Sequence, residues 1–134
     1  MKYLRFKHRF LHNLPVWPVI YPAVIFIALL DFWVEIYHRV AFPVYGLPYV
    51  KRKDYIVIDR HKLSYLTFSQ KINCVYCGYA NGVLQYIVKI VGETERYWCG
   101  IQHRQQEGYV APPHHAEFVE YGNEEEFKEA YLTH

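Results

Sequence analysis

The first third of the chain carries one long apolar run. From Val16 to Val34 the only charged side chain is Asp31. A helix that crosses a bilayer needs ~20 largely apolar residues, so the run is long enough to enter a membrane if Asp31 is tolerated. Three prolines gather at its front, where the first turn of a helix accepts them. The pattern predicts a membrane-embedded or interfacial helix over about residues 22–40, with the core helix of a soluble protein as the alternative.

The pattern changes after this run. Pro43, Gly46 and Pro48 interrupt a helix. The stretches "DYIVIDR" and "KLSYLTF" that follow are short, and they are either rich in β-branched residues or alternate between apolar and polar, which is typical of strands. Further on, "VLQYIVKIV" and "RYWC" flank the turn-like "GETE", and this arrangement predicts a hairpin. The expected fold class is α+β, with short antiparallel strands behind the N-terminal helix.

The stretch between residues 77 and 99 also fits a helix. Gln85 and Lys89 lie four positions apart and share a polar face with nearby asparagine and glycine, while the other positions are apolar. On this interpretation the protein is mostly α-helical and is built of helical hairpins. The β-hairpin is preferred because glycine and β-branched residues weaken a helix.

All three cysteines fall into one pattern with a histidine. Cys74 and Cys77 are three positions apart, 21 residues separate Cys77 from Cys99, and His103 follows Cys99. Two short ligand pairs on either side of a moderate insert have the usual spacing of a closed zinc site. The sequence predicts a structural zinc ion held by these four residues, provided that the chain reverses its direction between the two pairs.

The segment "CVYCG…RYWCGIQH" resembles a zinc ribbon, in which a Cys-x-x-Cys-Gly knuckle, a hairpin and a second knuckle surround one metal ion. The resemblance covers residues 74–103 and implies a structural Zn²⁺ site. The chain departs from the ribbon pattern in having His103 where a fourth cysteine is usual, and its first knuckle lacks the proline often found there. Two alternatives stay open: a redox-active Cys-x-x-Cys at the start of a helix, and cysteines that are simply buried.

Asp31, Glu35 and His38 form a second candidate site on the apolar helix. Their spacing of four and three residues places them on one helical face. Glu35 and His38 also make a Glu-x-x-His pair, which di-metal carboxylate proteins place on facing helices. The sequence holds no second Glu-x-x-His. A polar stripe at the membrane–water boundary is therefore the preferred interpretation, and a metal site completed by Glu95 or His103 is the alternative.

Charge is distributed unevenly along the chain. All but one of the 15 lysines and arginines precede residue 105, and seven of the 13 acidic residues follow it. A basic body suits a membrane surface, and residues 51–53 would meet lipid headgroups. Aromatic residues are not interleaved with basic ones, so nucleic acid is not an expected partner. We divide the chain into an anchor helix (1–45), a small α+β domain with the metal site (46–108) and an acidic tail with a short terminal helix (109–134).

These features predict a small membrane-anchored zinc protein with an accessory or interaction role and a protein partner. Catalysis is not expected, because four protein ligands leave no coordination position open for a substrate, and no small-molecule substrate is indicated. The alternative is a membrane metalloenzyme or redox accessory subunit that uses Glu35 and His38. The odd number of cysteines argues against a disulfide framework. We therefore expect an inner or cytoplasmic membrane location, with the cysteines facing the cytoplasm.

Overall fold

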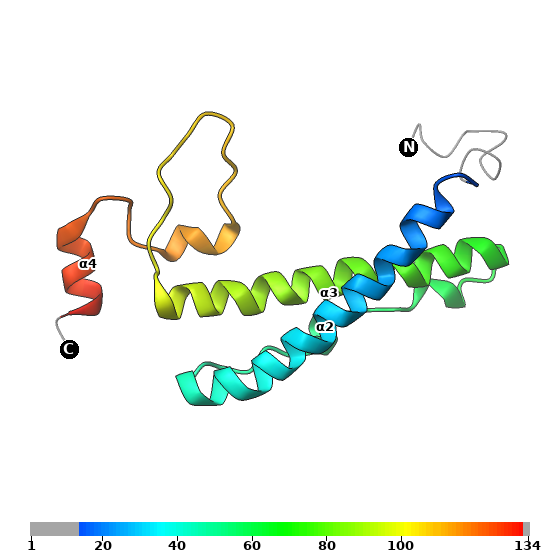
Figure 1. Cartoon of the computed structure of the whole chain (residues 1–134), viewed down its shortest axis with the longest axis horizontal. Helices are drawn as coiled ribbons and strands as arrows, with labels where there is room; N and C mark the ends of the chain where they lie inside the picture. The colour runs from blue at the N-terminus through cyan, green and yellow to red at the C-terminus, as the bar shows by residue number, and fades with distance from the viewer. Residues whose placement is uncertain (1–13, 133–134) are drawn as a thin grey trace.

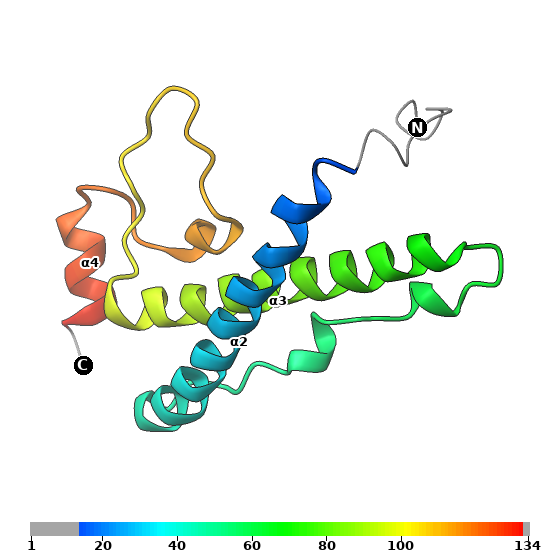
Figure 2. The same cartoon turned by 45° about the vertical axis from the view of Figure 1, so that its right-hand side comes forward.

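Two long helices dominate the computed structural model, which describes residues 14–132. α2 and α3 cross each other, and the short α4 lies beyond the far end of α3 (Figures 1 and 2). The elements in chain order, with η for a 3-10 turn, are α2 (Trp17–Tyr45), η2 (Arg52–Asp54), η3 (Arg60–Lys62), α3 (Phe68–Trp98), η4 (Pro113–Glu117) and α4 (Glu124–Tyr131). Among the described residues there is no β-strand, and one isolated bridge joins Ile101 to Val119.

The α+β prediction is wrong, and the mostly helical alternative describes the protein. α3 is unbroken from Phe68 to Trp98 and includes the whole stretch predicted as a hairpin. It begins with a capping box, in which the Thr67 N–H donates to the Gln70 side chain over 2.9 Å. The stretch "DYIVIDR", predicted as a strand, lies against α3 without a strand partner.

The glycines of α3 lie inside the helix and do not end it. They make room for other parts of the chain. A Cβ atom at Gly82 would lie 2.8 Å from the carbonyl oxygen of Tyr55 and 2.9 Å from the Cα of Ile56. Only glycine allows this approach of two backbones. The packing obtained in this way offsets the ~1 kcal/mol that a glycine costs inside a helix relative to alanine.

α2 extends further than predicted, to Tyr45, and it contains Pro43 near its end. Gly46 ends the helix with a left-handed φ of 68°. The N–H of Leu47 then donates to the carbonyl of Phe42 over 3.0 Å, which satisfies one of the last free carbonyls of the helix. The end of α2 is thus set by the glycine and not by the proline before it.

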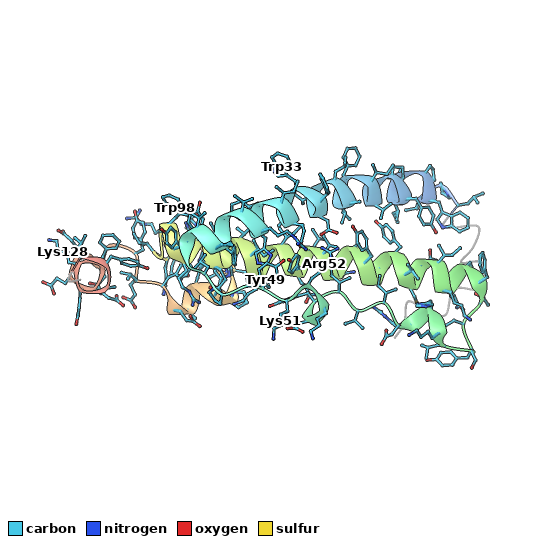
Figure 3. The ribbon with its side chains drawn as sticks, turned by 90° about the horizontal axis from the view of Figure 1, so that it is seen from below. Trp33, Tyr49, Lys51, Arg52, Trp98 and Lys128 are labelled. Carbon is cyan, nitrogen blue, oxygen red and sulfur yellow. The ribbon has the colours of Figure 1, made fainter. Side chains whose placement is uncertain are left out.

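The hydrophobic core lies where α2 crosses α3. Phe42 packs with Tyr86 and Ile90 of α3 and with Val50 from the connecting segment. This small core leaves the outer face of α2 uncovered, and Trp33 points away from α3 (Figure 3). Lys51 lies on the opposite side of the molecule in the same view. The molecule therefore has an apolar side, formed by α2, and a charged side, formed by the segment 46–67.

The C-terminal part of the chain folds back onto the last turns of α3. Residues 99–112 leave α3 as a loop (Figure 1), and η4 returns the chain so that His114 lies against Gly92. The chain just before the loop and the chain just after η4 meet where the Val119 N–H donates to the Gly100 carbonyl over 2.9 Å. α4 begins after Asn123, whose side chain accepts a hydrogen bond from the Glu126 N–H (3.1 Å), as the sequence predicts for a terminal helix.

Candidate metal centre

Glutamate and histidine side chains converge at the end of α3. Glu95 comes from the last turn of α3, His103 from the loop that follows, and His114 and His115 from η4. The adjacent prolines 112 and 113 explain the turn: their fixed φ starts a 3-10 turn, and the His115 N–H donates to the Pro112 carbonyl over 3.0 Å. This turn directs both histidines at Glu95.

The donor atoms of this cluster lie within reach of a single ion. His115 Nε2 lies 3.1 Å from Glu95 Oε1, and His114 Nε2 lies 2.9 Å from Glu95 Oε2. One ligand atom from each of Glu95, His103 and His115 lies within 4.8 Å of the others. A tetrahedral zinc ion holds its nitrogen and oxygen donors roughly 3.3 Å apart, from metal–ligand distances of about 2.0–2.1 Å. Small side-chain rotations would therefore bring the three donors onto a zinc ion.

His115 is the residue that points most clearly to an ion. It is only 3% exposed, and its Nδ1 is buried with no hydrogen-bond partner. If Nε2 carries the proton and donates to Glu95, a bare Nδ1 lone pair is left buried. If Nδ1 carries the proton, its N–H has no acceptor, and the Nε2 lone pair faces a carboxylate oxygen. Each tautomer leaves an unmatched group, which costs about 1–3 kcal/mol. In the second case a cation bound by Nε2 would lie between this lone pair and the carboxylate and would remove the mismatch at Nε2.

The electrostatics of the cluster favour a cation. Partial burial raises the pKa of the Glu95 carboxyl, but the hydrogen bonds with His114 and His115 lower it by more, and the net pKa lies below its ordinary value. Glu95 is therefore a carboxylate at neutral pH. Next to it, the Arg96 guanidinium pairs with Glu117 and ties η4 to α3. The chain thus holds η4 in place with an ion pair beside the candidate metal ligands.

His114 has a different position from the three candidate ligands. It donates to the Glu95 oxygen that does not face His115, so it can orient that carboxylate without contacting the ion. His114 also forms part of the wall of an open groove of about 560 Å³ along α3.

The structure does not bring the predicted ligands Cys74, Cys77, Cys99 and His103 together. Cys77 lies in the first half of α3 and Cys99 is its C-cap residue, so a continuous helix separates them by ~33 Å at 1.5 Å per residue. No single ion can bind both ends of such a helix. His103 does reach a cluster of metal-binding side chains, but with Glu95 and His115 instead of cysteines.

Asp31, Glu35 and His38 do lie together, at the crossing of α2 and α3. The carboxylate of Asp31 accepts two hydrogen bonds from Arg52 and one from the Tyr79 hydroxyl (2.8 Å). Glu35 accepts hydrogen bonds from the side chains of Arg39 (2.8 Å), Tyr49 (3.2 Å) and Tyr86 (3.0 Å). Every carboxylate oxygen of the pair thus already has a protein donor, which supports a structural polar network rather than a metal site.

The protonation of His38 follows from its partners. The Val50 N–H donates to His38 Nε2 over 3.2 Å, so Nε2 carries no proton. In the neutral ring Nδ1 then carries the proton and donates to the Tyr86 hydroxyl at 2.9 Å, which in turn donates to Glu35. Burial raises the pKa of Tyr86, and its hydrogen bond to Glu35 raises it further, so Tyr86 stays a neutral donor. His38 therefore holds α2, α3 and the connecting segment together.

Sequence reasoning on its own does not select Glu95, His114 and His115 as one site. The available signal is "PPHH", since two prolines before two histidines predict a turn that presents imidazoles. What the sequence lacks is the position of that turn, which only the return of the chain onto α3 defines. No family model, no curated protein and no solved structure matches the chain. The candidate site therefore rests on its geometry.

Proposed function

We propose that this protein is a membrane-attached metal-binding protein in which a zinc ion at Glu95, His103 and His115 fixes the C-terminal segment to the end of α3. The observation that carries the proposal is the convergence of these three side chains, a carboxylate and two imidazoles whose ligand atoms lie within 4.8 Å of one another. Zinc is favoured over magnesium or calcium because imidazole nitrogen is a ligand that zinc accepts readily and those harder cations do not.

A structural role for the ion is supported by how little else holds this part of the chain. The segment 99–123 contains one 3-10 turn and an isolated bridge, and its buried apolar side chains are Phe118 and Val119. Small units with so little core commonly depend on a metal ion or a disulfide. The three cysteines are free, so a metal ion is the available cross-link. Three protein ligands leave the fourth position of the ion to water, unlike the four-ligand site predicted from the sequence. The accessory or interaction role with a protein partner that we propose therefore depends on the structural task of the ion and not on a closed ligand shell.

Membrane attachment is supported by the surface of α2. The helix is long and apolar enough to enter a bilayer, yet only 6% of its most apolar part is buried in the molecule. A core helix of a soluble protein would be mostly covered. A removable signal segment does not fit either, because Phe42 and His38 of α2 belong to the buried centre of the fold. Free cysteines agree with a reducing compartment, and we therefore propose that this region faces the cytoplasm.

Elemental analysis of the full chain, purified in a mild detergent, tests the metal assignment. We expect one zinc ion per chain, and its loss in Glu95→Gln and in His115→Ala. Cys99→Ser is the matched control and retains the ion, since its thiol is not a ligand in this assignment. Loss of zinc in Cys99→Ser together with retention in His115→Ala would overturn the proposal.

A further inference from the structure

We infer that α2 lies in the plane of one membrane leaflet and does not cross the bilayer. The inference rests on the membrane attachment proposed above and adds an orientation to it. It commits the exposed face of α2 to a single partner, the acyl-chain region of a lipid leaflet.

The first reason is the position of charged groups along α2. Asp31 is the middle residue of Trp17–Tyr45, and the Arg52 guanidinium binds its carboxylate. Residues 51–53 therefore lie level with the midpoint of the helix, and Lys51 and Lys53 are exposed there. If α2 crossed the bilayer, both lysines would lie near its centre, where each costs at least ~2.5–3.5 kcal/mol.

The second reason is the backbone beside α2. Residues 46–67 connect the two helices through η2, η3 and irregular chain, and they run along α3 for much of its length (Figure 2). Non-helical backbone facing lipid is not found within the hydrocarbon region, because its N–H and C=O groups have no water to bind. This segment must therefore lie in water or at the headgroups.

The third reason is that the charged side chains of α2 lie on the side that faces α3 or at its edge. Asp31, Glu35 and His38 face α3, and Arg39 lies at the edge of the apolar side, paired with Glu35. The opposite side is uncharged, and its most exposed members are Val19, Phe26, Leu29, Phe32, Trp33, Val40 and Val44. Because the charged groups of α2 face α3 or its edge, the helix can place its apolar side in the acyl chains of one leaflet without burying a charge there.

The end of α3 extends the same apolar side. Tyr97 stacks on Tyr45, with 4.6 Å between the ring centroids, and Trp98 packs edge-on against Tyr45. Trp98 and Trp33 point to the same side of the molecule, and Lys51 lies on the other (Figure 3). Tryptophan and tyrosine are enriched at membrane–water interfaces, so this aromatic group fits the edge of the inserted face.

Cysteine labelling distinguishes the two orientations. In a full chain carrying Cys74→Ser, Cys77→Ser and Cys99→Ser, single cysteines are placed by Ser69→Cys, Lys53→Cys and Gln105→Cys. Ser69 lies near the start of α2, where Tyr21 binds Asn73, and Gln105 lies beyond the end of α3, where Tyr97 meets Tyr45. Leu29→Cys, on the exposed apolar face, is the control that lipid should shield. The reagent is a membrane-impermeant maleimide, applied to sealed membrane vesicles of known orientation.

We expect Ser69→Cys, Lys53→Cys and Gln105→Cys to react from the same side of the vesicle, and Leu29→Cys to react from neither side. A crossing helix would make Ser69→Cys and Gln105→Cys react from opposite sides, with Lys53→Cys protected, and this result would overturn the inference. Failure of the chain to float with the vesicles, including the case of a soluble dimer that covers the apolar face, would overturn both the inference and membrane attachment. The zinc content, measured separately, would still test the metal site.

Discussion

His115 Nε2 lies 3.1 Å from Glu95 Oε1, although 20 positions separate the two residues in the chain. One side chain comes from a 3-10 turn and the other from the last turn of a helix of 31 residues. The contact brings an ionised carboxylate to a buried imidazole whose second nitrogen has no partner. It thereby links the end of α3 to the returning C-terminal segment, and it is the relationship on which the proposed zinc site depends.

Two neighbouring histidines should differ in their effect on zinc binding. His115→Ala removes a proposed ligand and should abolish tight binding. His114→Ala removes only the donor that orients Glu95, so the affinity should fall by ~10–100-fold while one zinc ion still binds at saturation. Titration with a chelating indicator measures both values. His61→Ala, in the distant turn η3, is the control and should bind as the unaltered chain does. Equal losses for His114→Ala and His115→Ala would contradict the assigned roles.

Gly82→Ala tests the packing of the connecting segment on α3. In an isolated helix the change stabilises by ~1 kcal/mol. Here the new Cβ would meet the backbone of Tyr55 and Ile56 at 2.8 and 2.9 Å, so the segment must move, and we expect a net destabilisation of about 1–3 kcal/mol. Denaturant unfolding in mild detergent measures it. Gly78→Ala, whose Cβ would lie 3.2 Å from the Val57 carbonyl, should cost less. Stabilisation by Gly82→Ala would mean that this segment does not pack there.

These glycines also explain why the sequence misleads about the fold. Asn81-Gly82 and Gly92 look like interruptions of a helix when only neighbouring residues are considered. In the structure, Gly82 faces the backbone of Tyr55 and Gly92 faces the His114 ring, so both are packing positions inside one helix. The amphipathic pattern around Gln85 and Lys89 predicts this helix correctly, but local propensity cannot reveal that a distant segment requires the glycines. The apolar character of α2 could be predicted because it needs no distant partner.

The length of α3 can be measured directly with its own cysteines. In a Cys74→Ser background, spin labels on Cys77 and Cys99 should give a distance on the order of 33 Å, increased somewhat by the label linkers, because the helix rises 1.5 Å per residue. Cys77 and Cys99 are exposed, so labelling does not disturb the fold. Pulsed electron spin resonance gives the distance. A value short enough for the two cysteines to share one ion would contradict the continuous helix, because it would require the chain to reverse its direction between them.

The Asp31–Arg52 pair should contribute to the stability of the helix crossing. Asp31 is 6% exposed, and Arg52→Gln would leave its carboxylate with only the Tyr79 hydroxyl. We expect a loss of about 1–3 kcal/mol in the free energy of unfolding. The double variant Asp31→Asn, Arg52→Gln should lose less than the sum of the single variants, because it leaves no unpaired charge. Lys51→Gln, at an exposed position, is the control. Additive losses would show that the two side chains do not interact.

The candidate sites differ in how much of each can be predicted from the sequence. The common face of Asp31, Glu35 and His38 follows from helical spacing, and the structure places them together. The cysteine spacing, by contrast, carries no information on whether the chain turns between Cys77 and Cys99. His103 enters the predicted zinc site only through its distance from Cys99. Its contact with His115 depends on the return of the loop, which no local pattern encodes.

The ligand shell of the bound metal ion tests the central claim most directly. X-ray absorption at the zinc edge, on the purified full chain, separates nitrogen and oxygen ligands at about 2.0–2.1 Å from sulfur ligands at about 2.3 Å. A site made by Glu95, His103 and His115 predicts a shell of nitrogen and oxygen only, with the multiple-scattering pattern of imidazole. A sulfur shell would contradict this site, since it would place zinc on the cysteines of α3.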